Sequence, residues 1–205
     1  MKIGYLGARA TVLVEKVSTS PPMARNHMRH CTMTKEILIR KCSFEIEFVN
    51  CKRDDFLNDV FQYGVSAVRF PTSQSSDLAW NVLLSLGDGA LYFVAGKSCS
   101  TDAFNEYFFL SFERIKSDDA RASIDLKTFL VSGSAEFHVD SIAILYYEDN
   151  DMYLEGGITL NNCENRGVSI VVAPSPGAVA IADMEQYPTV NSDLNFSQAK
   201  VERKK

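Results

Sequence analysis

Residues 135–160 read AEFHVDSIAILYYEDNDMYLEGGITL and carry the strongest structural signal in the chain. Two apolar runs, 143–147 and 152–154, flank the acidic turn 148–151. β-Branched and aromatic residues on both sides of Asp and Asn turn formers are typical of a β-hairpin. The Gly156-Gly157 pair within Tyr153–Leu160 indicates a bulge or a close approach of another backbone. The sequence therefore predicts an antiparallel hairpin here.

Short apolar segments and turn residues continue on both sides of this hairpin. The apolar residues between Ile37 and Phe48 change parity near Arg40-Lys41, which predicts a half-buried strand with a bulge. Asp54-Asp55 is expected to open a short helix that Gly64 ends. Further strands are expected at 66–70, 78–86, 90–95, 107–112, 124–131, 168–173 and 178–182.

These segments predict one α+β domain, predominantly antiparallel β-sheet with one or few short helices. A chain of 205 residues with 46% hydrophobic and 23% charged residues is ordinary for a globular domain. We expect residues 33–183 to form the domain and the polar segment 184–205 to be a frayed tail. Residues 1–32 are poor in core residues and are either a functional basic arm or a segment outside the folded domain; we favour the second.

Charge is distributed unevenly along the chain. The formal net charge is −5, and residues 1–32 contribute +4 of it, which leaves −9 for the remainder. The leader's charged residues are Lys2, Arg9, Glu15, Lys16, Arg25 and Arg29. An acidic domain disfavours nucleic-acid binding and favours a basic partner.

Cysteine usage and hydropathy bear on the compartment. The five cysteines are scattered, without the paired spacing of a zinc site, which favours reduced thiols in the cytoplasm. No apolar run approaches the length of a membrane span. We therefore expect a cytoplasmic protein that needs no cofactor or metal and has no membrane partner.

Catalytic motifs are absent from the sequence. Gly96-Lys97-Ser98 is similar to the end of a phosphate-binding loop, but Leu91 stands where that loop needs its first glycine. His138 and Asp140 would share one face of a strand, where an exposed pair is favoured over an acid–base pair. Cys99 is expected in a loop shortly after Lys97, a setting that lowers a thiol pKa, yet no base is identified beside it.

The hairpin turn combines carboxylates with tyrosines. The carboxylates Glu148, Asp149, Asp151 and Glu155 do not follow the calcium-binding order of an EF-hand, so a solvated acidic turn is favoured. The neighbouring aromatic residues are Tyr146, Tyr147 and Tyr153. Tyrosine among carboxylates suits an interface with a basic protein.

Two stretches resemble a known family. The segment 144–149, with Tyr153 and Leu160 beyond the turn, resembles a hairpin of some bacterial immunity proteins, the inhibitors of contact-dependent growth inhibition toxins and their relatives. Trp80 followed by Ser85-Leu86-Gly87-Asp88-Gly89 is similar to an upstream stretch in such proteins, whereas the intervening region 90–141 is longer here. The resemblance implies tight binding to a toxin domain, often a nuclease, without catalysis.

The leading hypothesis is therefore a non-enzymatic immunity protein that neutralises a basic toxin domain by direct binding. The residues expected at the interface are Tyr147, Glu148, Asp149, Asp151 and Tyr153, with Asp54 and Asp55 as further candidates. One alternative is a β-rich enzyme or small-ligand carrier with a pocket between sheets that uses His138 or Cys99. Another is a structural or assembly subunit whose hairpin pairs with a second chain through its edge. The oligomeric state stays open.

Overall fold

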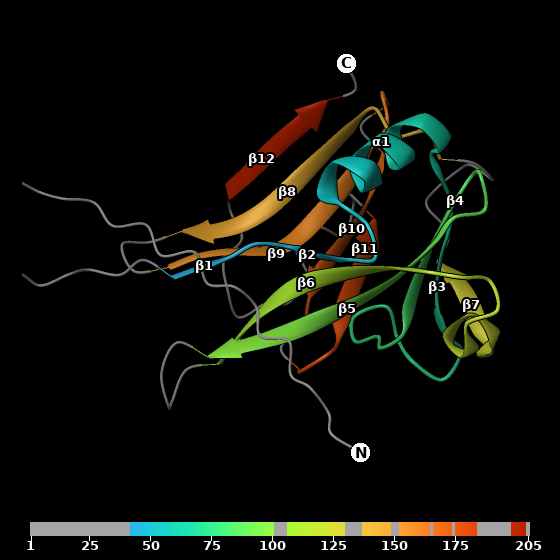
Figure 1. Cartoon of the computed structure of the whole chain (residues 1–205), viewed down its shortest axis with the longest axis horizontal. Coiled ribbons are helices and arrows are strands. Elements are labelled where there is room, and N and C mark those ends of the chain that lie inside the picture. The colour runs from blue at the N-terminus through green and yellow to red at the C-terminus, as the bar shows by residue number, and fades with distance from the viewer. Residues whose placement is uncertain are drawn as a thin grey trace, which may run out of the picture.

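In the part of the chain that the structure describes, one α-helix lies beside two β-sheets (Figure 1). A computed structural model describes residues 42–100, 106–129, 137–148, 152–164, 166–173, 175–183 and 198–203. Within them, most strand pairings are antiparallel and two are parallel. The domain is thus β-rich, with mixed sheets and a single short α-helix in the described part of the chain.

Each sheet has six strands in the described residues. The first has the order β11-β10-β9-β8-β12, with β1 paired to β9, and its strands are β1 (Cys42–Phe44), β8 (Ser141–Glu148), β9 (Met152–Asn161), β10 (Gly167–Val172), β11 (Val179–Asp183) and β12 (Gln198–Arg203). The second has the order β2-β6-β5-β4-β3-β7, from β2 (Glu47–Val49), β3 (Val65–Pro71), β4 (Val82–Leu86), β5 (Leu91–Ser100), β6 (Glu106–Ile115) and β7 (Leu126–Phe129). A 3₁₀ turn, η1 (Ala120–Ser123), precedes β7.

The hairpin predicted from residues 135–160 is confirmed as β8–β9. Leu145 pairs with Gly157 and Tyr146 with Glu155, so Gly156 is the extra residue of a bulge. A Cβ at Gly157 would lie 3.1 Å from carbon atoms of both Leu145 and Val171. The glycine pair therefore serves both functions that the sequence suggested, a bulge and a close approach.

Helix α1 (Arg53–Tyr63) is also confirmed. It ends at Gly64, whose φ of 66° is readily adopted only by glycine. Its buried face presents Phe56 and Val60. The Phe56 ring lies 4.8 Å from that of Phe112 and 5.0 Å from that of Tyr92, so the helix packs on aromatic residues of β5 and β6.

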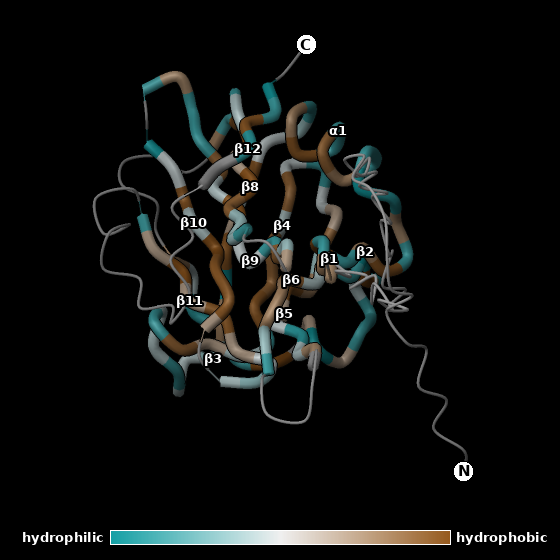
Figure 2. Tube along the Cα trace, turned by 90° about the vertical axis from the view of Figure 1, so that its left-hand side faces the viewer, coloured by the Kyte–Doolittle hydropathy of each residue, from teal (hydrophilic) through white to brown (hydrophobic). Residues whose placement is uncertain are grey.

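The core lies where apolar side chains of the two sheets meet. Phe44 of the first sheet stacks on Phe109 of the second, with ring centroids 6.1 Å apart. Figure 2 shows hydrophobic segments along β8, β9, β10 and β4 in the interior, while hydrophilic residues gather at the ends. Burying a large apolar side chain contributes roughly 1.5–3 kcal/mol, so this core is the main source of stability.

The strand predicted between Ile37 and Phe48 is wrong as a single element. Its first part lies outside the described residues, and the rest is two strands, β1 and β2, that belong to different sheets. The chain crosses between the sheets at Glu45-Ile46. The predicted parity nevertheless holds, because Ile46 is buried and Phe44 and Phe48 pack against the core.

The strand predicted at 78–86 is shorter than expected. Only Val82–Leu86 forms β4, because Asn81 has a φ of 61° that interrupts extended backbone. Before it, Ala79 makes an isolated bridge to Val179, and the Trp80 backbone N–H donates to Gln74 Oε1. This left-handed residue divides the predicted strand, and all five residues of β4 are buried, so the strand has no exposed face.

The loop expected around Cys99 is a strand as far as Ser100. β5 continues its pairing with β6 up to Ser100↔Glu106. Gly96 is required here by packing rather than by a turn, since a Cβ would lie 2.7 Å from the carbonyl oxygen of Ala178.

The polar segment after Asp183 also contains a strand. Gln198–Arg203 forms β12, which pairs antiparallel with β8 from Gln198↔Tyr146 to Arg203↔Ser141. A frayed end is therefore the wrong description for these six residues. The sequence of β12 shows no hydrophobic alternation. Its backbone hydrogen bonds to the edge of β8 form without apolar side chains.

Candidate acidic interface

The open end of the hairpin is the region singled out by the sequence. Glu148, at the end of β8, pairs with Tyr153 of β9 and is exposed. The rings of Tyr146 and Tyr153 lie 5.3 Å apart, and both residues are half-buried, as is Tyr147. Asp149 and Asp151 lie outside the described residues. The described end of the hairpin thus presents tyrosine rings next to an exposed carboxylate.

Glu155 does not belong to this exposed group, contrary to expectation. It is 2% exposed, and its carboxylate accepts from the Ile46 backbone N–H at 2.9 Å and the Tyr153 O–H at 2.9 Å. Arg53 Nη1 lies 3.1 Å from Oε2 and 3.3 Å from Oε1 of the same carboxylate. A buried carboxylate needs such partners, so Glu155 is structural.

The Glu155 carboxylate explains how the chain can cross between sheets. Ile46 lies between β1 and β2, where its backbone N–H has no strand to pair with, and Glu155 accepts that hydrogen bond instead. Arg53 is the first residue of α1, so its ion pair joins the start of the helix to β9. One buried carboxylate therefore holds three segments together.

The Arg53–Glu155 ion pair places the start of α1 beside the part of β9 that includes Tyr153. Asp54 and Asp55 follow Arg53 in the first turn of α1 and are exposed. Both also stabilise the helix start, since acids are favourable there and Asp55 Oδ2 accepts from the Lys52 backbone N–H at 3.4 Å. The helix residues thus combine a local structural role with an exposed position.

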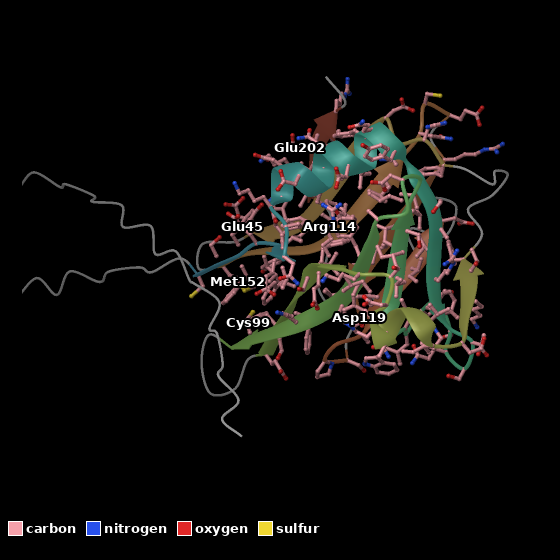
Figure 3. All side chains as sticks on the ribbon, turned by 45° about the vertical axis from the view of Figure 1, so that its right-hand side comes forward. Glu45, Cys99, Arg114, Asp119, Met152 and Glu202 are labelled. Carbon is pink, nitrogen blue, oxygen red and sulfur yellow. The ribbon has the colours of Figure 1, made fainter. Side chains whose placement is uncertain are left out.

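Glu45 adds a further exposed carboxylate to this end. It follows β1, which pairs with the first residues of β9, and its charge contributes to raising the pKa of Tyr153. Figure 3 labels Glu45 and Met152 at this end of the molecule. We define the acidic end as Glu45, Asp54, Asp55 and Glu148 with Tyr146, Tyr147 and Tyr153.

The Tyr153 phenol stays neutral and remains a donor at neutral pH. Burial raises its pKa well above the usual range, and the charge of Glu155 and the hydrogen bond to it act in the same direction. Tyr153 therefore fixes the hairpin face as well as contributing ring surface to it.

Cys99 is unsuited to nucleophilic chemistry. It lies in β5 rather than in a loop, and burial raises its pKa to about 12, with further increases from Cys42 and Glu106. Its thiol donates to the Tyr107 carbonyl at 3.5 Å. The expected lowering of its pKa is therefore wrong, because desolvation dominates at this position.

His138 and Asp140 are both exposed on either side of the buried Val139. They do share one side of the chain, although only Phe137 among these residues forms a bridge, to Val65. His138 lines an open hollow of about 230 Å³. The hollow's other lining residues are Gln62, Tyr63, Val65, Ser66, Gly87 and Phe137. A hollow of this size is smaller than most small-molecule pockets.

Metal sites and membrane spans are not found in the described part of the chain. None of its His, Cys, Asp and Glu residues form a group of three or more that could hold a metal ion. Its one α-helix lacks the length and apolarity to cross a membrane.

The sequence alone did not identify Arg53 or the structural role of Glu155. A signal for the carboxylate was present: Glu155 interrupts an apolar run between Leu154 and Gly156-Gly157, where a buried charge requires a partner. Nothing in the sequence points to Arg53 as that partner, which lies 102 positions away.

Comparison with known proteins gives no family for this chain: no protein-family model, curated protein or solved structure matches it.

Proposed function

We propose that this chain is a non-enzymatic binding protein whose acidic end neutralises a basic partner, as an immunity protein does for a toxin domain. The observation that supports the proposal is that two exposed carboxylates lie near the Tyr146–Tyr153 ring pair: Glu148 pairs with Tyr153 across the hairpin, and the charge of Glu45 acts on the Tyr153 phenol. Carboxylates accelerate encounter with a basic surface, and tyrosines provide contact area at low entropic cost.

The Arg53–Glu155 pair would give this surface a fixed shape. It links the start of α1 to β9, so the acids of the helix and those of the hairpin keep their relative positions. A rigid surface loses little entropy on binding, which favours tight association.

The direct test is binding to the product of a neighbouring gene with a basic domain. Reversing charge at Glu148, Asp149 and Asp151 to Lys is expected to weaken the affinity more than tenfold, equivalent to about 1.4 kcal/mol. The affinity of the wild-type chain should also fall as salt increases. Unchanged affinity in the charge-reversed variant would exclude the assigned interface.

Glu164→Lys provides a matched control for Glu148→Lys. Glu164 is exposed and follows β9 at the end remote from the hairpin turn, about 26 Å along the strand at 3.3 Å per residue. Both variants change the net charge by the same amount, so their affinities differ only if the partner binds at the acidic end. Equal loss of binding in both would indicate general attraction rather than the acidic end.

Small-ligand binding is the second candidate, and the hollow beside His138 is the observation that favours it. His138→Ala separates the two functions. Under the first proposal this variant binds the basic partner as well as the wild type, because the hollow is not part of the acidic end.

A further inference from the structure

β12 forms one edge of the first sheet. β12 is the last strand of its sheet, and none of the described strands pairs with its far side. Figure 1 shows it as the outermost strand of the molecule. An edge of this kind offers a row of backbone donors and acceptors to another strand.

Val201 lies near the middle of this edge strand and is 52% exposed, more than any other large apolar residue in the described part of the chain. Lys200 and Glu202 flank it. Their side chains point to one face of the strand, since Lys200 Nζ lies 3.6 Å from Glu202 Oε1. An apolar residue between two opposite charges makes the strand complementary to a reversed copy of itself.

The register of two antiparallel β12 strands determines which charged residues lie opposite each other. When two copies of β12 pair antiparallel about Val201, Lys200 of each copy lies opposite Glu202 of the other, and the two Val201 side chains meet. Centring the pair on Lys200 or on Glu202 places like charges opposite each other. A two-fold axis between antiparallel strands must be centred on one residue pair. Of the registers centred on Lys200, Val201 or Glu202, only the one centred on Val201 pairs opposite charges, and it does so twice.

We propose that this chain self-associates through β12, forming a two-fold symmetric dimer in which the first sheet of one copy continues into that of the other. A two-fold axis through Val201 is the symmetry that a self-complementary strand requires, which identifies the partner as a second copy of this chain. The single strand pair is small compared with a permanent dimer interface, so the dimer forms reversibly and depends on concentration and salt.

The edge strand in this dimer is β12, not a strand of the β8–β9 hairpin, whose edge the sequence suggested for pairing with a second chain. β12 already occupies the free side of β8, so the next strand can only add to β12. This inference is independent of the acidic end and of any toxin partner.

Sedimentation velocity of the full chain at low salt, over a wide concentration range, tests the proposal. The wild type is expected to shift from monomer towards dimer as concentration rises. Lys200→Glu and Glu202→Lys are each expected to weaken self-association more than tenfold, because each variant places like charges opposite one another.

An equimolar mixture of these two variants gives the sharpest result. The introduced acid of the first variant then lies opposite the introduced base of the second, and the native Glu202 of the first faces the native Lys200 of the second. A heterodimer is therefore expected at wild-type strength, and the double variant K200E/E202K should likewise restore the homodimer. Unfolding curves of all variants confirm that loss of dimer is not loss of fold.

A wild type that remains monomeric throughout would overturn the proposal. So would a dimer that survives either single substitution, or single variants that do not associate with each other when mixed.

Discussion

The buried pair Arg53–Glu155 allows a quantitative test of what holds the acidic end in place. Arg53→Met removes the cation and retains the aliphatic stem of the side chain. Removing one partner of a fully buried ion pair costs about 3–5 kcal/mol. Arg53 is 25% exposed and its Nη2 has no partner among the described residues, so the pair is incompletely buried and incompletely satisfied. We therefore expect a loss of about 2–3 kcal/mol in the free energy of unfolding.

Glu155→Gln tests the other side of the pair. The amide oxygen, in place of Oε2, can still accept from the Ile46 N–H, but the amide N–H₂ group replaces Oε1, which accepts from Arg53 and Tyr153. We expect a loss of about 1–3 kcal/mol. In the double variant R53M/E155Q the losses should fall short of their sum by about 1–2 kcal/mol, because both substitutions remove the same interaction.

Urea denaturation followed by far-UV circular dichroism and by fluorescence of the single tryptophan, Trp80, measures these values. Arg166→Met is the matched control: Arg166 also pairs with a carboxylate, Glu164, but both side chains are more than half exposed. Its effect should stay below about 1 kcal/mol. The stabilising role of the Arg53–Glu155 pair is refuted if Arg53→Met changes stability no more than Arg166→Met does, or if the losses of Arg53→Met and Glu155→Gln add in full in the double variant.

Three further predictions concern other parts of the fold. Gly157→Ala should destabilise the protein by about 1–2 kcal/mol in the same assay, since the added methyl overpacks the hairpin against β10; an unchanged midpoint would refute the close approach. Cys99 should react with iodoacetamide much more slowly than the exposed Cys163 at neutral pH, because burial raises its pKa to about 12; peptide mass spectrometry measures both rates, and equal rates would contradict this. Hydrogen bonds from Arg121 lower the pKa of Asp119 to about 2, so its contribution to stability is present above an unfolded-state pKa of about 3.9 and is lost as pH falls towards 2. The difference in unfolding free energy between the wild type and Asp119→Asn should therefore become smaller as pH falls from about 4 to about 2. A difference that stays constant over this range would exclude the effect of Asp119 ionisation on stability.

The elements that sequence patterns predicted well are those with local causes. The hairpin follows from turn residues between two β-rich runs, and α1 from an acidic opening and a terminal glycine; neither depends on distant partners. The bulge at Gly156 was also readable, because glycine within a strand weakens regular pairing and marks a bulge or a close approach.

The elements that were missed depend on long-range pairing. β12 is held by backbone hydrogen bonds to β8, which leave no hydrophobic period in its sequence. The division of 42–49 between two sheets depends on a carboxylate 109 positions from Ile46. For the site, the exposed Glu148 could be recognised as acidic surface. The place of Glu155 within an apolar run was a signal of a buried charge, but its partner Arg53 could not be identified because it lies 102 positions away.

The crossing of the chain between β1 and β2 also sets the order in which the molecule can fold. Both strands pair in parallel with strands made much later, β2 with β6 and β1 with β9. During synthesis the apolar side chains of Phe44, Ile46 and Phe48 therefore lack their partners at first, and contacts of such large sequence separation form slowly. We expect β1 and β2 to dock late and to close both sheets in one event, so that the earliest described segment to leave the ribosome is among the last to reach its native place.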